Sequence, residues 1–237
     1  MNREIIDLPC GLFGPLMSDW ILNVRGRAGS DSVTGNGQVV YGNAPRWEAT
    51  LDLSGFGRDR QLAWAAIRAR MRGRVNLLRV CVCDRWRPKY QELGLSALDI
   101  AMIRGDGIPH DEGSLFDTDV GYDYTPTVTT DAEWEAGSEF ITVDATSING
   151  ALTAGQWFSW NDWPYQVTGI EGDMDETTYY FEPALRRDLP AGAEIIAGEA
   201  SGIFAFQTDL EGRMARELGK HGNTQIQLVE WTNRPIE

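Results

Sequence analysis

Residues 46–80, RWEATLDLSGFGRDRQLAWAAIRARMRGRVNLLRV, contain the pattern that decides the fold of this chain. Apolar and polar side chains alternate in residues 46–53, which predicts a strand with one buried face. The segment 54–57 breaks that strand, and a helix is predicted from an N-cap at Asp59 to Arg72, with Gly73 as its stop. Residues 75–83 are rich in apolar and β-branched side chains and predict a returning strand.

The predicted helix carries two apolar stripes. The first holds Ala63, Trp64, Ile67 and Met71. The second lies on nearly the opposite side and holds Leu62, Ala65, Ala66 and Ala69. A surface helix needs one apolar stripe, so a second stripe indicates packing on two sides.

Two partners for the second stripe remain open, a neighbouring subunit and an inserted module of the same chain. Small side chains let two backbones approach closely, and an arginine ridge runs beside the stripe. For the first alternative we predict a subunit interface formed by Leu62, Ala66, Arg68, Ala69 and Arg72.

Charge is sorted along the chain. Residues 58–91 carry ten Arg and Lys against two acidic residues, whereas residues 92–199 carry twenty-two Asp and Glu against three Arg. This change of sign predicts an acidic β-rich domain, 92–199, inserted into a discontinuous host domain formed by 1–91 and 200–237. Strands predicted at 202–208 and 225–231 return the chain to the host.

The second half of the acidic block has the pattern of a small β-barrel. Five short strands are predicted at 140–143, 156–160, 163–167, 177–182 and 194–197, separated by turn residues. So many strands in such a short stretch are typical of an OB-like or SH3-like barrel. Residues 92–139 lack this regularity and predict a long loop with short elements. In the host domain, Gly35-Asn36-Gly37 predicts a tight hairpin turn.

The sequence contains no motif of a known catalytic centre or nucleotide site, so we predict neither enzymatic activity nor a bound cofactor. Cys10, Cys81 and Cys83 are too few for a disulfide framework and are predicted to be buried thiols. His110 and His221 are predicted to be surface residues. No apolar run is long enough for a membrane span, and the early acids of the N-terminus are unlike a signal peptide, which predicts synthesis in the cytoplasm.

Two weaker site hypotheses concern the acidic domain. Its loops could hold a hard cation such as calcium, or they are simply solvated. The acids of the best cluster are Asp106, Asp111, Glu112, Asp117 and Asp119. Trp157, Trp160 and Trp163 gather at one predicted hairpin, where they either stack on a sugar or belong to the barrel core.

Residues 46–80, together with the segment GALTAGQWFSWNDWPYQVTGIEGDMDETTYYFEPALRRDLPAGAEIIAG and the following SGIFAF, resemble the distal tail proteins of long-tailed bacteriophages. The resemblance implies a tail-tube-like β-sandwich with one flanking helix and an inserted small β-barrel domain. It also implies a structural protein of the virion, made in the host cytoplasm and assembled at the tail tip or baseplate.

The resemblance further implies a homohexameric ring that joins the tail tube protein to the hub or tip proteins and leaves a channel for DNA. A net charge of −14 agrees with this, because an acidic chain repels the phosphates of passing DNA. Alternatives are a carbohydrate-binding module of the tail tip and a tail hub protein. One hub family carries an iron–sulfur cluster, and three cysteines argue against that assignment.

Overall fold

The computed structural model describes residues 3–9, 13, 17–24, 27–28, 39–40, 44–82, 85–105, 107–108, 124–214 and 222–234. The backbone divides into two compact units, Met1–Cys83 with Gly202–Glu237, and Asp84–Ser201. Charge alone predicts these boundaries at 91/92 and 199/200. The second unit begins earlier because the segment after Asp84 is bound to the barrel, through the Arg87–Glu199 ion pair and a hydrogen bond from the Gln156 side chain to the Trp86 carbonyl.

The first unit is built on one mixed sheet of six strands in the order β1-β6-β13-β14-β5-β2. Its strands are β1 (Ile5–Asp7), β2 (Met17–Asn23), β5 (Arg46–Phe56), β6 (Leu77–Cys81), β13 (Ser201–Phe206) and β14 (Gly222–Glu230). β1 and β6 are parallel, whereas β13, β14, β5 and β2 follow one another as antiparallel pairs. A further short pair joins β3 (Arg27–Ala28) to β4 (Val39–Val40). The hairpin turn predicted at 35–37 lies outside the described residues.

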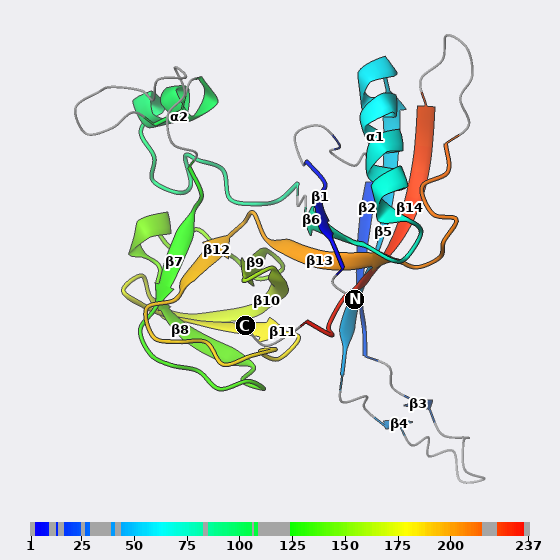
Figure 1. The fold of residues 1–237 in the computed structure, drawn as a ribbon. Helices are drawn as coiled ribbons and strands as arrows, with labels where there is room; N and C mark the ends of the chain where they lie inside the picture. Colours follow the sequence, from blue (N-terminus) through cyan, green and yellow to red (C-terminus); the bar gives the residue numbers. More distant parts are fainter. Residues whose placement is uncertain are drawn as a thin grey trace. The chain divides into compact units, whose positions relative to one another are not determined.

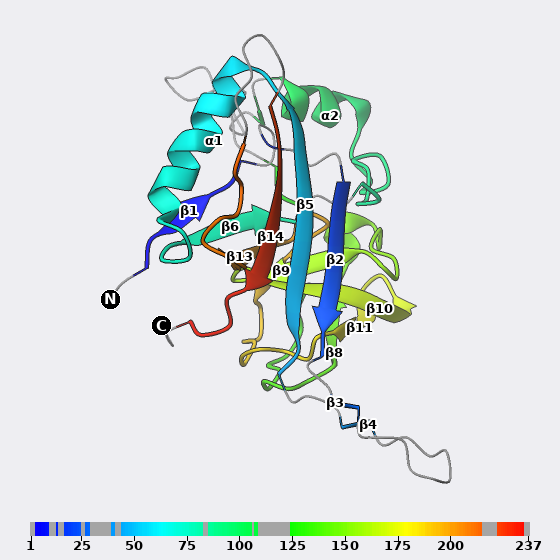
Figure 2. The same cartoon turned by 90° about the vertical axis from the view of Figure 1, so that its right-hand side faces the viewer.

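This sheet changes direction within itself. β14, β5 and β2 run alongside one another (Figures 1 and 2), and β13, which pairs with the end of β14, runs at a steep angle to them (Figure 1). The resemblance implies a sandwich of two sheets, whereas the described strands of this unit form one six-stranded mixed sheet with a helix beside it, and the short pair β3–β4. The predicted returning strands near 202–208 and 225–231 correspond to β13 and β14.

The strand and helix predicted within 46–80 are present, with different boundaries. Side chains at alternate positions of β5 are buried, as the alternation predicts: Trp47, Ala49, Leu51 and Leu53. The strand does not break at 54 but continues to Phe56, whose side chain is also buried. The N-cap of α1 (Arg58–Met71) is therefore Gly57, and Asp59 lies in the first turn instead of capping the helix. At the other end Arg72 adopts a left-handed conformation, and Gly73 follows it.

Helix α1 is anchored to the first unit through its larger apolar stripe. Trp64 and Met71 are buried, and Ala63 and Ile67 are half-buried. The indole Nε1 of Trp64 donates a hydrogen bond of 2.9 Å to the carbonyl of Gly212, and its ring meets Phe13 edge-on at 5.9 Å. The helix therefore has a fixed orientation that decides which stripe faces outward.

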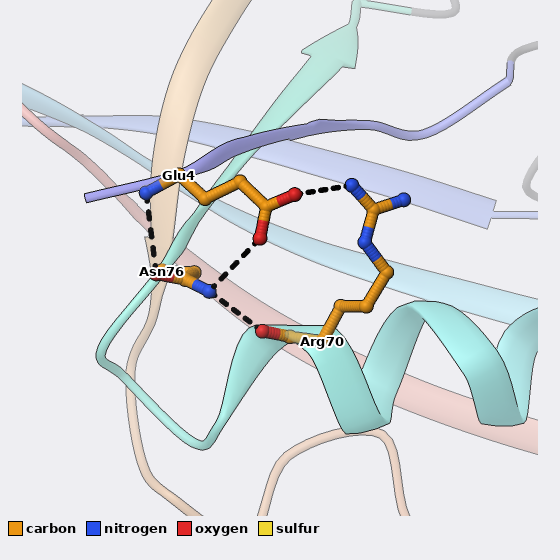
Figure 3. A network of polar contacts seen from close by, with 3 residues as sticks. All are labelled: Glu4, Arg70 and Asn76. Carbon is orange, nitrogen blue, oxygen red and sulfur yellow. Dashed lines mark hydrogen bonds and ion pairs between the residues drawn. The ribbon is translucent and has the colours of Figure 1, made fainter. Parts of the chain in front are cut away.

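A polar network ties the C-terminal end of α1 to β1 and β6 (Figure 3). The side-chain amide of Asn76 donates to the Arg70 carbonyl at 2.7 Å and to Glu4 Oε2 at 3.5 Å, while its oxygen accepts from the Glu4 backbone N–H at 3.2 Å. The Glu4 carboxylate also pairs with the Arg70 guanidinium. Asn76 is buried, so these bonds satisfy a side chain that would otherwise be costly to bury.

The second unit is a closed barrel of six antiparallel strands in the order β10-β11-β8-β7-β12-β9. The strands are β7 (Thr127–Thr130), β8 (Phe140–Asp144), β9 (Trp157–Trp160), β10 (Trp163–Asp173), β11 (Glu176–Glu182) and β12 (Glu194–Ala197). Its centre is aromatic: Phe158 stacks on Tyr165 at 5.2 Å and meets Phe181 edge-on at 5.2 Å. A one-turn 3-10 helix, Thr146–Ile148, follows β8.

Two short elements lie within 92–139, where the sequence predicts a long loop with short elements of unspecified type. The sixth strand, β7, supplies the buried Val128 and Thr130 and pairs with β8 and β12. Helix α2 (Ala97–Arg104) begins with a capping box in which Ser96 and Asp99 bond to each other's backbone N–H groups. The predicted fold class is confirmed: the chain is mainly β, with a flanking helix and an inserted small barrel.

Candidate functional site

The second stripe of α1 lies on its outward side. Leu62 is 53% exposed, and Ala66 and Ala69 are exposed as well. The helix is held in place by Trp64 on its other side, so the stripe presents a fixed, shallow apolar surface. Side chains this small cover little of the helix backbone. A second protein surface can therefore come close to it without displacing bulky groups.

The two arginines predicted for the same interface have different roles. Arg68 is half-buried, and its Nε donates a hydrogen bond of 2.9 Å to the carbonyl of Glu211. It therefore fixes the turn that also receives the Trp64 indole. Arg72 is exposed at the left-handed C-cap. Leu62, Ala66, Ala69 and Arg72 are thus accessible together, whereas Arg68 has an internal role as well.

The sheet adds an accessible feature that the sequence analysis missed. Strand β2 is an edge of the sheet and pairs with β5 alone among the described strands. Its outward side chains include two large apolar ones, Met17 at 60% and Ile21 at 57% exposure. Their spacing of four residues in MSDWILN fits one face of a strand. However, the sequence does not show that this face lies at an edge and is left uncovered.

The tryptophan hairpin is mostly part of the barrel. Trp157 and Trp163 are 5% and 4% exposed, so neither has an open face on which a sugar ring can stack. Trp160 is half-buried and packs against the hydrophobic core. Burial therefore favours the second alternative, in which these tryptophans belong to the barrel core.

Several other predicted residues lie outside the described part of the chain. These are Asp106, Asp111, Glu112, Asp117, Asp119, His110, His221, Cys10 and Cys83. Within the described part, no three His, Cys, Asp or Glu side chains gather closely enough to hold a metal ion. Nor is any helix there long and apolar enough to cross a membrane. Cys81 is disulfide-bonded, which corrects the prediction of a buried thiol at this position.

The shifted acid–base groups of the barrel have structural causes. Burial raises the pKa of the Tyr179 hydroxyl far above its usual range. Hydrogen bonds from the Thr146 hydroxyl and backbone N–H lower the pKa of Asp144. Burial, assisted by the nearby Glu139 carboxylate, raises the pKa of Glu182. These groups are spread over the barrel strands and their connections and do not converge on one cleft.

Comparison with known proteins adds no family. No model of a known protein family matches the chain, and no curated protein matches it. The candidate site therefore rests on the accessible surfaces of α1 and β2.

Proposed function

We propose that this protein is a structural component of a long-tailed phage virion that forms a ring at the distal end of the tail. In this role it joins the tail tube protein to the hub or tip proteins and leaves a channel for DNA. The observation that carries the proposal is the exposed small-residue stripe of α1, held outward by the buried Trp64. Closed rings repeat one contact between two different patches, and such a rigid stripe suits one side of it.

The remaining features support the same role. The strand–helix–strand stretch and the inserted barrel are the elements on which the resemblance to distal tail proteins rests. A net charge of −14 repels DNA phosphates at short range, so the chain suits a passage that DNA crosses without specific binding. The function is that of assembly and involves neither catalysis nor a cofactor.

The test is to place bulk on the stripe. Ala66→Trp and Ala69→Trp each add a large side chain where we expect a neighbouring subunit to pack. Overpacking of this kind costs about 1–3 kcal/mol per contact, and in a ring the same lesion recurs at every interface. We expect the wild-type protein to form rings with a central channel in negative-stain images, and the two variants to remain monomeric by native mass spectrometry. Their thermal unfolding should match the wild type.

Ala101→Trp is the matched control, because Ala101 is an exposed alanine on the other helix, α2. It should leave ring formation unchanged. Normal rings from Ala66→Trp and Ala69→Trp would overturn the interface. A wild-type protein that forms no ring alone, and that is not incorporated into tails, would overturn the proposed function.

A further inference from the structure

A pocket of about 200 Å³ in the unit Asp84–Ser201 gathers positive charge. This unit contains six Lys and Arg residues, and four of them line the pocket: Arg85, Arg87, Lys89 and Arg104. Arg87 is paired with Glu199 at 2.5 Å. The other three cations make no ion pair within the described part of the chain. A unit that is otherwise strongly acidic therefore concentrates its unpaired cations at one place.

The barrel fixes the walls of this pocket. The Gln156 side chain donates a hydrogen bond of 2.5 Å to the Trp86 carbonyl, which holds the basic segment to the turn before β9. Pro88 packs so closely on Gly198 that a Cβ there would lie 2.9 Å from the proline ring. Gly198 also donates its N–H to the Trp157 carbonyl at 2.9 Å. The backbone that carries Arg85, Arg87 and Lys89 is therefore anchored to the strands.

The same unit carries an acidic projection of matching charge. The hairpin tip between β10 and β11 exposes three carboxylates, Asp173, Asp175 and Glu176. Its backbone is anchored, because Ala145 donates its N–H to the Met174 carbonyl at 2.8 Å and the Thr177 hydroxyl donates to the Asp173 carbonyl at 2.6 Å. Little conformational freedom of the tip is lost when it binds, which favours a contact through it.

We propose that the pocket binds carboxylates of the β10–β11 tip of a second copy of this chain. The inference rests on the proposed function, in which identical copies lie side by side. Copies of net charge −14 repel one another, and opposite charges placed directly at a contact offset that repulsion. Guanidinium groups hold carboxylates through paired hydrogen bonds, and Arg87 already binds one carboxylate at this pocket. The unpaired Arg85, Lys89 and Arg104 are left to bind those of the neighbour.

Charge reversal on each side tests this contact. The pocket variant carries Arg85→Glu and Arg104→Glu, and the tip variant carries Asp173→Lys and Asp175→Lys. Each variant alone should self-associate at least about tenfold more weakly than wild type by sedimentation, because like charges then face each other. An equal mixture of the two variants should regain association, since every junction between unlike partners again joins opposite charges. Association of the wild type should weaken as salt is raised from about 0.1 M to about 1 M.

The control for overall repulsion is Asp131→Lys with Glu133→Lys, two exposed acids of the same unit whose reversal changes the net charge by the same amount as the tip variant. It should not weaken association. Rings that survive both reversals would overturn this inference and leave the proposed function standing. A dimer that is weakened by both reversals, from a protein that forms no ring, would support this inference and overturn the proposed ring. If free citrate weakens self-association and the tip variant does not, the pocket binds a small carboxylate instead, and the inference is overturned.

Discussion

The two units solve the problem of sheet edges in different ways. The barrel closes on itself and leaves no strand edge, whereas the six-stranded sheet ends at β1 on one side and β2 on the other. An open edge presents unpaired backbone groups that a second chain can pair with, and a closed barrel removes them. Contacts made by the sheet unit can therefore use backbone and apolar packing, through β2 and α1. Contacts made by the barrel must use side chains, and its pocket and hairpin tip offer charge.

The largest losses of stability are expected from removing a large buried side chain from the core of either unit. Phe158 in the barrel and Trp64 on the buried side of α1 are each 1% exposed, so replacing either by Ala should cost its unit about 3–5 kcal/mol. If the units fold separately, Phe158→Ala should speed amide hydrogen exchange in β8–β11 alone, and Trp64→Ala in β5, α1 and β14 alone. Hydrogen-exchange mass spectrometry separates the two regions. Leu62→Ala, on the exposed stripe, should change neither.

Exchange that rises in both regions for both variants would contradict this comparison. It would mean that sheet and barrel unfold as one cooperative body. The roles assigned to α1 and to the pocket would then no longer be separable by substitution in one unit.

Periodic patterns in the sequence predicted much of this fold because burial enforces them. The alternation in β5 follows from which face of the strand is buried. The glycines of the turns between barrel strands follow from backbone geometry, since Gly155, Gly172 and Gly192 all have positive φ. Strand β7 was missed because TVTT contains three polar threonines, although Thr130 is buried through bonds to the Pro190 carbonyl and the Ala193 N–H. Helix α2 did carry a signal, the Ser96–Asp99 capping box, but it is short and sits among irregular residues.

The sequence predicted the candidate sites less completely than the fold, because some of their residues are brought together only by folding. The small-residue stripe follows from helix geometry alone, so its residues could be named from the sequence. The pocket is lined by Arg85, Arg104 and Gly198, which lie far apart in the sequence. Only the folded structure shows that they are neighbours. Charge by segment groups the basic residues 85–89 with the host, whereas the division of the backbone places them in the unit Asp84–Ser201.

A smaller loss of stability is expected from replacing Gly172, at the acidic tip, by Ala. Comparison with Gly137 separates the cost of backbone strain from the cost of a steric clash. Gly172 has φ +96°, and a Cβ there would lie 2.2 Å from the Glu176 carbonyl oxygen. Gly137 has nearly the same φ, +94°, with no atom within 4 Å of such a Cβ. Both Ala variants suffer from the left-handed backbone, by about 1–2 kcal/mol, but only Gly172→Ala adds a clash, worth about 1–3 kcal/mol more. Urea unfolding of the two variants measures the difference, and equal stabilities would show that the tip relaxes freely.

The smallest effects are expected from two carboxyl groups of the barrel whose pKa values shift in opposite directions. Burial, aided by Glu139, raises the folded-state pKa of Glu182, so the neutral acid is favoured in the fold and stability is lost as pH rises through that pKa. Glu182→Gln mimics the neutral acid and should stabilise the barrel near pH 7 but not near pH 4.

Bonds from Thr146 lower the folded-state pKa of Asp144, so the stabilising effect of the Asp144 carboxylate is present at neutral pH and is lost as pH falls. Asp144→Asn should therefore destabilise near pH 7 and matter less in acid. Urea unfolding at the two pH values measures both, and the same sign of change for both variants at pH 7 would show that charge at these positions does not govern the stability of the barrel.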